Sequence, residues 1–336
     1  MPENSNGNGS GKKRIAMYWA ASCGGCDISL LEIGPRLLEL IKIAEVAFWP
    51  CAADFKYADV AAYPEAHLDL CFFNGGIRNS EQEEVARMLR RQSKTLIAYG
   101  ACAGDGGIPA LANLKTVEAI YDAAYHTNPS IDNPDRQEPQ PRFETPYGDL
   151  EIPRFYPAVL RLKDVVEVDY EIPGCPPQAD RVWESVQAVA GGAVPPRNSG
   201  VRVGCGDKTV CDDCPREKRQ VKIARFRRPH QIRPEAGWCL LEQGILCMGP
   251  ATRSGCGALC LKADLPCEGC YGVPHAAEDQ GTSMIGALGG LLDATTEERA
   301  RELIAQIPDP TGTFYRFSMA SSMMKVRKED GSGGAV

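Results

Sequence analysis

Cysteine is the residue type that most clearly carries chemistry in this sequence. Five of the 15 cysteines fall within the stretch CMGPATRSGCGALCLKADLPCEGC, which spans positions 247 to 270. Closely spaced cysteines form disulfides, bind zinc or bind iron–sulfur clusters. An odd total leaves at least one thiol outside any disulfide framework, and the N-terminal stretch has no apolar secretory segment. We therefore expect a reducing, cytoplasmic location, where clustered thiols bind metal.

Four thiols directly follow predicted strands. Cys23 and Cys26 follow RIAMYWA, Cys102 follows TLIAYG, and Cys175 follows VEVDYEIPG. Because the carboxyl ends of parallel strands lie along one edge of an open sheet, we expect these four side chains to converge. Neighbouring glycines allow tight turns that present backbone amides to sulfur. Four thiolates in such a place fit a 4Fe-4S cubane, with a tetrahedral zinc site as the alternative.

Nine further thiols follow residue 200, and eight of them would fill two cubanes. A Cys-x-x-Cys pair, Cys211 and Cys214, can combine with Cys239 and Cys247 across a basic excursion. The second set is more compact in the sequence and consists of Cys256, Cys260, Cys267 and Cys270, which leaves Cys205 over. Exchange of one ligand between the two sets stays open, because ferredoxin-like sites often do this. Two structural zinc ions would also satisfy eight thiolates.

Other residues near these sets have simpler interpretations. Cys71 lies inside the apolar run LDLCFF, which predicts a buried hydrophobic side chain. Cys51 could approach the strand-end site, and Asp54 nearby is a possible substitute oxygen ligand. Asp27 and Glu32 flank the first Cys-x-x-Cys pair; carboxylates at the start of a helix are the simpler interpretation, with assistance to proton movement as the second.

The elements that must position the first thiols indicate an α/β fold. Short apolar runs alternate with helical periodicity up to about residue 200, which is typical of parallel βα units. A flavodoxin-like parallel sheet is therefore predicted, with a proline-rich excursion over residues 127–156. The predicted strands lie at 14–20, 45–50, 68–76, 94–104 and 165–177, and helices are predicted over about 28–41 and 80–93.

Regular patterns fade after residue 200 while cysteine density rises. We expect a cysteine-rich, ferredoxin-like iron–sulfur domain with little regular structure, which buries little apolar surface and folds around bound metal. The predicted organisation is a disordered segment 1–11, a flavodoxin-like domain 12–200 with one cluster, a two-cluster domain 201–315, and a tail 316–336 whose end is disordered.

Charge and hydropathy narrow the classes of partner. The net charge is -7, which argues against nucleic acid as a partner, and no apolar window is long enough to span a membrane. One local exception is the basic run, residues 216–233, which holds eight Lys or Arg and one Glu. It is either a solvated excursion or a docking surface for an acidic electron-accepting subunit.

Eight motifs in this order and spacing resemble a known family. They are CGGCDISLLEI, FWPCAADFKYADV, FFNGGIRNSEQEE, GACAGDGGIPALANL, PGCPPQ, CDDCPREK, CLLEQGILCMGPATRSGCGALC and PCEGCYG. From about Lys13 to Thr313 the chain resembles the small, electron-transferring subunit of nickel–iron hydrogenases. It is most similar to the cytoplasmic methyl-viologen-reducing type, which works with heterodisulfide reductase.

The resemblance implies three 4Fe-4S clusters and no catalytic residue in this chain, because the nickel–iron centre belongs to a large partner subunit. By position, Cys23, Cys26, Cys102 and Cys175 match the proximal ligands. Cys211, Cys214, Cys239 and Cys247 match the distal ligands, and Cys256, Cys260, Cys267 and Cys270 match the medial ligands. Two positions depart from many respiratory relatives: Cys211 stands where they have histidine, and Cys260 where they have proline.

Other functions stay open at this point. The acceptor implied by the resemblance is an iron–sulfur or flavin subunit linked to heterodisulfide reductase, with deazaflavin-reducing or NAD(P)-reducing assemblies as alternatives. Outside this class, a flavodoxin-like FMN carrier would leave the eight C-terminal thiols unexplained. A zinc-stapled adaptor would be colourless.

Overall fold

The computed structural model describes residues 12–193, 196 and 201–324. The predicted disordered segment 1–11 and the end of the tail, from residue 325 onward, lie outside the described residues. The chain divides into two compact units. The first comprises residues 1–77, 81–104 and 162–204, and the second comprises residues 78–80, 105–161 and 205–336. The domain boundaries expected from the sequence stay predictions.

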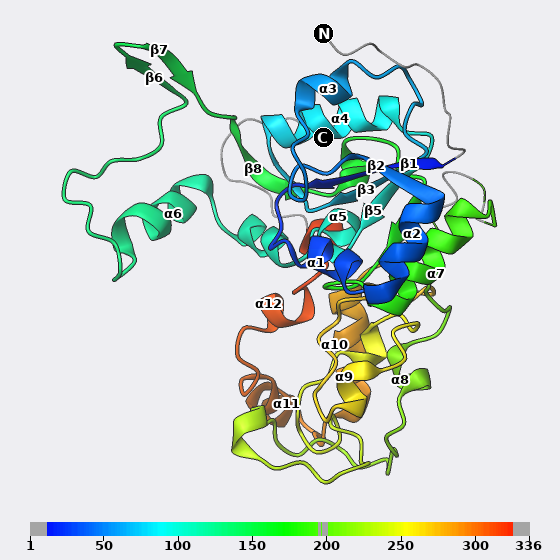
Figure 1. Ribbon diagram of the computed structural model, residues 1–336. Helices are drawn as coiled ribbons and strands as arrows, with labels where there is room; N and C mark the ends of the chain where they lie inside the picture. Colours follow the sequence, from blue (N-terminus) through cyan, green and yellow to red (C-terminus); the bar gives the residue numbers. More distant parts are fainter. Residues whose placement is uncertain (1–11, 194–195, 197–200, 325–336) are drawn as a thin grey trace. The chain divides into compact units, whose positions relative to one another are not determined.

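A five-stranded sheet is the centre of the first unit (Figure 1). Its strand order is β2-β1-β3-β5-β9 and every pairing is parallel. This is the flavodoxin-like order. The second strand is added on one side of β1, and all later strands of the sheet are added on the other side. The predicted α/β class and parallel sheet are therefore confirmed. The strands are β1 (Lys13–Trp19), β2 (Ala44–Phe48), β3 (Leu70–Asn74), β5 (Leu96–Tyr99) and β9 (Tyr170–Ile172).

Both faces of this sheet are covered. β3 and β5 are buried along their whole lengths, as strands between two layers of helices require. Met17, Phe72 and Tyr99 belong to one buried cluster with residues of the flanking helices. The sheet is therefore a rigid support for whatever follows the ends of its strands.

Helices of the first unit largely follow the predicted pattern, with one correction. The single helix predicted over about 28–41 is wrong, because Gly34 has a positive φ of 63° and Pro35 follows it in a short 3-10 turn. Proline restricts the residue before it and lacks an N–H, so the first helix ends and a second begins. The helical segments are α1 (Gly25–Leu31), η1 (Gly34–Arg36), α2 (Leu37–Ile43), α3 (Tyr57–Ala61), α4 (Ser80–Gln92), α5 (Ala101–Asp105), η4 (Leu162–Asp164) and α7 (Ala179–Ala190).

The proline-rich excursion belongs to the second unit and ends in a hairpin that Figure 1 shows in green. Its two strands pair antiparallel, and another short sheet joins β4 to β8. The segments here are η2 (Ile108–Leu114), α6 (Val117–Asp122), a π-helical turn η3 (Ala123–Thr127), β6 (Arg142–Thr145), β7 (Gly148–Glu151), β4 (Ile77–Asn79) and β8 (Phe155–Leu160).

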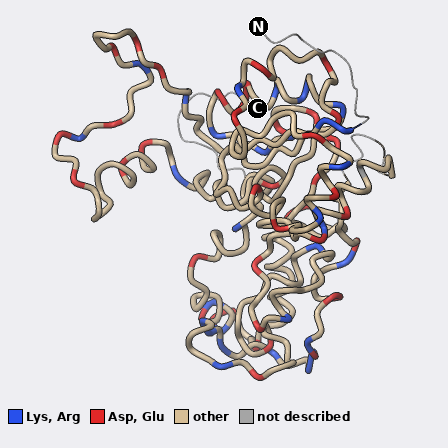
Figure 2. Tube along the Cα trace, in the orientation of Figure 1, with Lys and Arg blue, Asp and Glu red and all other residues tan. Residues whose placement is uncertain are grey.

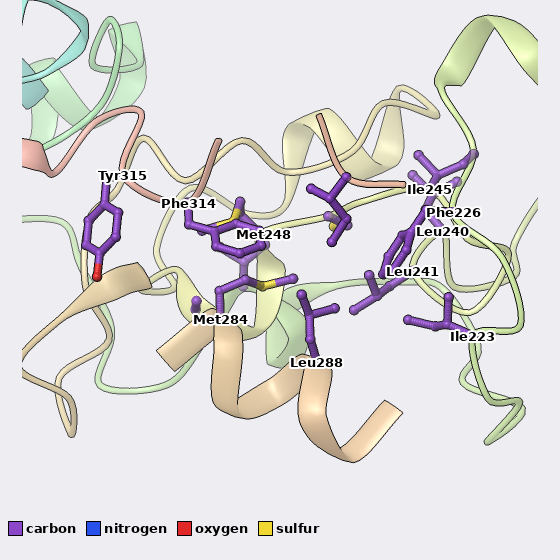
Figure 3. Close-up of a cluster of buried hydrophobic side chains, with 14 of the residues drawn as sticks. Ile223, Phe226, Leu240, Leu241, Ile245, Met248, Met284, Leu288, Phe314 and Tyr315 are labelled. Carbon is purple, nitrogen blue, oxygen red and sulfur yellow. The ribbon is translucent and has the colours of Figure 1, made fainter. Parts of the chain in front are cut away.

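The cysteine-rich unit has a larger apolar core than the sequence analysis expects. Figure 3 shows Met248 and Phe314 beside the helix that carries Met284 and Leu288, and all four are buried. The expectation that this part buries little apolar surface is therefore wrong. Its apolar residues are scattered between turns and short helices, so they show no long periodic pattern in the sequence.

Short helices and turns frame this core. They are α8 (Val210–Asp213), η5 (Pro229–Gln231), η6 (Gly249–Ala251), α9 (Leu259–Lys262), α10 (Gln280–Leu291), α11 (Glu297–Ile304), α12 (Pro310–Phe314) and η7 (Met319–Ser321). In the part of the chain that the structure describes, no helix has the length and apolar character needed to cross a membrane.

Candidate metal centres

The first thiol set begins where β1 ends. Gly24 takes a positive φ of 83°, which turns the chain so that Cys26 becomes the second residue of α1. Cys23 is exposed, Cys26 is buried, and the backbone N–H of Gly25 donates to the Cys23 sulfur at 3.4 Å. The turn thus presents two sulfurs and one amide at the carboxyl edge of the sheet.

Two strand-end loops bring further thiols to the same edge. Cys102 lies in α5, directly after β5, and Cys175 follows β9. Burial raises the pKa of the Cys26 thiol, and electrostatic interactions with Cys102, Cys175 and Cys23 raise it further. Cys102, Cys175 and Cys23 thus lie near enough to Cys26 to affect its titration, and the assignment of the four thiols to one ligand set stays a prediction. A bound cation or cluster would be needed to hold such thiols as thiolates near neutral pH.

Glycine makes room for this set. Gly100 precedes α5 with a φ of 85°, and a Cβ there would lie 2.4 Å from the Cys26 sulfur. No real Cβ approaches sulfur so closely, because the van der Waals radii overlap. The thiol of Cys26 can occupy its place only because residue 100 has no side chain.

Asp27 is anchored rather than exposed to solvent. Its carboxylate accepts hydrogen bonds from Trp49 Nε1 at 2.7 Å and from Asn74 Nδ2 at 2.8 Å, and Ser22 Oγ donates to Asn74 Oδ1 at 2.9 Å. These bonds tie the first turn of α1 to the ends of β2 and β3. Sequence reasoning missed the supporting side chains Ser22, Trp49 and Asn74. Their positions at or shortly after the ends of strands were the available signal.

The other residues considered near the first set differ in burial. Cys71 is fully buried, which confirms the interpretation of its strand position, and burial raises its pKa to about 12. Cys51 and Asp54 are both exposed. Burial raises the pKa of Cys51, and the Asp27 carboxylate raises it further. A ligand role for Cys51 or Asp54 stays a prediction.

The second thiol set lines a cavity of about 400 Å³ in the second unit. Its wall includes all four sulfur-bearing residues Cys211, Cys214, Cys239 and Cys247, together with apolar side chains such as Leu240, Leu241 and Leu261. A Cβ at Gly249 would lie 3.2 Å from the Cys211 sulfur and 3.6 Å from the Cys247 sulfur, so this glycine also forms part of the cradle.

Burial dominates the chemistry of these thiols. It raises the pKa of Cys211 to about 12, although Lys218 opposes the shift, and it raises the pKa of Cys247 to about 11 against hydrogen bonds from the N–H groups of Gly249 and Cys267. Metal binding at such thiols must displace protons.

The third set adjoins the second. Burial raises the pKa of Cys260, and the nearby Cys256 raises it further. Burial also raises the pKa of Cys267, and electrostatic interactions with Cys247 and Cys270 add to this shift. The backbone N–H of Cys267 donates to the Cys247 sulfur at 3.3 Å. The third set is therefore joined to the second by a hydrogen bond to sulfur.

A site for a single metal ion would need several donor side chains close together. Within residues 12–193, 196 and 201–324, no group of three or more His, Cys, Asp or Glu side chains is arranged to hold a metal ion. Cys205 is half-buried in the second unit, and its role stays open.

Comparison with known proteins gives consistent likenesses. A model of the family described as NADH ubiquinone oxidoreductase, 20 Kd subunit, matches residues 23–189. The iron-sulfur subunit of the F420-non-reducing hydrogenase of Archaeoglobus profundus is 37% identical, over 93% of this chain and 97% of that protein. A subunit of the F420-non-reducing hydrogenase of Methanothermobacter thermautotrophicus is 35% identical, over 95% and 98%. The crystal structure of an NAD+-reducing nickel–iron hydrogenase in the H2-reduced state is similar at 31% identity, with a TM-score of 0.46 over 54% of this chain and 92% of that one.

A sheet edge with cysteines after its strands and a cysteine-rich unit, taken with the two similar hydrogenase subunits, define an iron–sulfur protein of electron transfer. The resemblance noted in the sequence is confirmed. The chain belongs to the family of iron–sulfur small subunits of nickel–iron hydrogenases, alongside those of the F420-non-reducing hydrogenases. It is one subunit of an oxidoreductase and has the hydrogenase large subunit as its partner.

Proposed function

We propose that this subunit holds three 4Fe-4S clusters and passes single electrons between the large subunit and an acceptor subunit. The observation that carries the proposal is the cavity of about 400 Å³ whose wall includes one complete set of four cysteines. The proximal ligands are Cys23, Cys26, Cys102 and Cys175, the distal ligands are Cys211, Cys214, Cys239 and Cys247, and the medial ligands are Cys256, Cys260, Cys267 and Cys270.

The donor sets suit such clusters. A 4Fe-4S cluster supplies one-electron chemistry within a range of about -700 to +450 mV, set by its charge, its hydrogen bonds and its exposure. The chain contributes each of these influences. It supplies twelve sulfur ligands, of which three are buried, seven are half-buried and two are exposed, and it donates N–H groups to sulfur from Gly25 and Cys267.

Two ligand identities favour a low-potential relay. Cys211 stands where many respiratory relatives have histidine, and Cys260 where they have proline. A set of four thiolates carries more negative charge than a set with a neutral ligand, which disfavours adding an electron. Such sets suit reversible exchange with a low-potential acceptor better than delivery to a high-potential quinone.

The contact face for the large subunit is proposed to lie beside the first thiol set. Trp19 is 41% exposed, and Ile28 and Leu31 on α1 are 55% and 45% exposed. Apolar side chains at this density are typical of permanent subunit interfaces. Because they flank Cys23 and Cys26 in the sequence, a subunit bound here would face the proximal thiols.

The acceptor is proposed to be an iron–sulfur or flavin subunit linked to heterodisulfide reductase, in the cytoplasm. The names of the relatives favour it over a deazaflavin-reducing assembly, because they are called F420-non-reducing and F420 is a deazaflavin. An NAD(P)-reducing assembly is the other alternative, and an NAD-reducing hydrogenase subunit from Cupriavidus necator is similar at 29% identity. The family leaves an FMN carrier or a zinc-stapled adaptor without support.

Anaerobic purification tests the proposal directly. The purified subunit should be brown, with about twelve iron and about twelve acid-labile sulfide per chain, because each cubane holds four of each. Mass spectrometry of the co-purifying chains should identify the large subunit and the acceptor. About four iron per chain would leave one cluster only, and zinc without iron would overturn the proposal.

A further inference from the structure

Part of the basic run, residues 216–233, is engaged inside the second unit. Arg216 is buried and forms an ion pair with Asp264. Arg219 forms an ion pair with Glu235 at 2.7 Å. The amine of Lys222 donates to a backbone carbonyl of α10. These cations are engaged in contacts within the unit, so the run is not one uniform charged surface.

Three arginines of the same run differ from these. Arg225, Arg227 and Arg228 are exposed, and none of them forms an ion pair with another described residue. Phe226 between them is buried, so the extended chain directs Arg225 and Arg227 outward. The N–H of Arg227 donates to the Gly244 carbonyl at 2.8 Å, which fixes the backbone beneath them. In Figure 2, blue Lys and Arg positions recur along the lower edge of the second unit.

The three arginines line a cleft of about 980 Å³. A fourth arginine of the lining, Arg316, pairs with Glu268 at 2.8 Å. Among the described residues, the only other carboxylate of the lining is Asp309, which caps α12 by accepting from the Gly312 N–H at 2.9 Å. Four arginines against two carboxylates leave an excess of two positive charges. The volume is at the upper end for small-molecule pockets, which are about 300–1,000 Å³.

Apolar side chains make up much of the remaining lining, which also holds Gln231, Gln306 and Thr313 and reaches a thiol set. Phe226, Ile245, Leu246 and Ile307 contribute to the wall. Cys267 also lines the cleft, and its N–H donates to the Cys247 sulfur. A chain bound in the cleft would therefore lie against a residue that belongs to one thiol set and is hydrogen-bonded to the other.

We propose that this cleft binds an acidic, partly apolar segment of the electron-accepting subunit. The inference rests on the proposed function and adds the docking site to it. The exposed arginines of the lining match carboxylates, and its apolar residues match apolar side chains between them. A polyphosphate would find no partner for the apolar residues of the lining. Docking here brings the acceptor to the thiol sets of the second unit.

Removal of two arginines tests the cleft. The complex of this chain with its large subunit would be purified anaerobically as wild type, as R225Q/R227Q, and as a control, K222Q/R233Q. Both variants lose two cations from the same run, and neither control residue lines the cleft. The probe is a fluorescein-labelled peptide of three Glu-Leu-Glu-Ala repeats, with binding followed by anisotropy at low salt. R225Q/R227Q should bind it about tenfold more weakly, and the control should stay within about twofold of wild type.

Each outcome of this test has a distinct meaning. If both variants bound the peptide equally weakly, general charge attraction would explain binding and the proposed docking site would be rejected. If neither variant bound it more weakly than wild type, the proposal would also be rejected. Tripolyphosphate that displaced the peptide at equal charge concentration would show a simple anion site instead, which also overturns the proposal. Iron content and hydrogen-dependent benzyl viologen reduction, measured on the same samples, report failure of the proposed function separately, because neither needs the cleft.

Discussion

Gly100 shapes the first thiol set through the side chain that it lacks. Its φ of 85° belongs to the left-handed region, and its Cα faces the Cys26 sulfur. Residue 100 therefore meets two constraints: it must adopt the left-handed backbone conformation of the turn after β5, and it must leave space for a thiol. Conformation alone would tolerate asparagine in such a turn, but the space would not.

Substitution of Gly100 by alanine should remove one cluster. The new Cβ would lie 2.4 Å from the Cys26 sulfur, so the thiol must move out of the set. Iron should fall from about twelve to about eight per chain, because one cubane is lost. The control is Gly25→Ala, whose Cβ would lie 3.4 Å from the Cys23 sulfur without a positive φ, and iron should be retained. Full iron in the Gly100 variant would contradict the assignment of Cys26.

Among the elements, α10 depends on a single carboxylate for its start. Asp279 Oδ1 accepts from the Thr282 N–H at 2.7 Å and from the Tyr315 hydroxyl at 2.8 Å, while Oδ2 accepts from the Met323 N–H at 2.8 Å. Burial alone would raise the pKa of Asp279, but these donors lower it below its usual 3.8. The carboxylate thus joins α10, α12 and the segment after η7.

Asp279→Asn should destabilise the protein in a pH-dependent way. The amide would turn an N–H donor toward the Met323 N–H, at a cost of about 1–3 kcal/mol. A lowered pKa means that the wild-type contribution is complete above pH 3.8 and is lost as the pH falls through the lower native value. Thermal unfolding under anaerobic conditions should therefore show a large difference between variant and wild type at pH 7 and a smaller one near pH 3.5.

The matched control for that experiment is Thr296→Ala at the start of α11. Thr296 caps an exposed turn by accepting from the Arg299 N–H at 3.2 Å. Its loss should cost about 1 kcal/mol at both pH values, because a hydroxyl does not titrate there. A difference for Asp279→Asn that stayed constant with pH would show that the charge of Asp279 is unimportant.

The sequence predicts some elements well and others poorly, for physical reasons. Strands such as β3 are short apolar runs beside turn residues, so the local sequence is enough to predict that they are buried. The break at Gly34 and Pro35 was missed because the apolar spacing continues across it. α10 was missed because its glycines lower helix propensity, and its buried Met284 and Leu288 gain their stability from residues distant in the sequence. The places of Cys102 and Cys175 after strands were predictable, whereas the hydrogen bonds from Trp49 and Asn74 to Asp27 depend on contacts between distant segments and were missed.

Over the whole molecule, the thiol sets are divided between two compact units. The strand-end set belongs to the first unit, and the other two sets belong to the second. If the sets form one series, loss of the first must interrupt the flow to the others even when their ligands are intact. Activity with an external electron acceptor is therefore a property of the series rather than of one site.

Cys102→Ser should test this dependence. Serine is a poor cluster ligand, so hydrogen-dependent viologen reduction should fall by at least roughly tenfold, as when support at a metal site is removed. Cys51→Ser is the control, because its thiol is exposed and lies outside the proposed sets. A normal rate in the Cys102 variant would reject the role of that residue, and a low rate in the Cys51 variant would add it to the ligands.

The N–H of Cys267, which donates to the Cys247 sulfur, links two neighbouring thiol sets through residues 247–270. A peptide shift at position 267 moves a donor of one set and a ligand of its neighbour together. Anyone who transplants one of these centres into another scaffold must carry the whole segment across, since neither half keeps its electrostatic surroundings without the other.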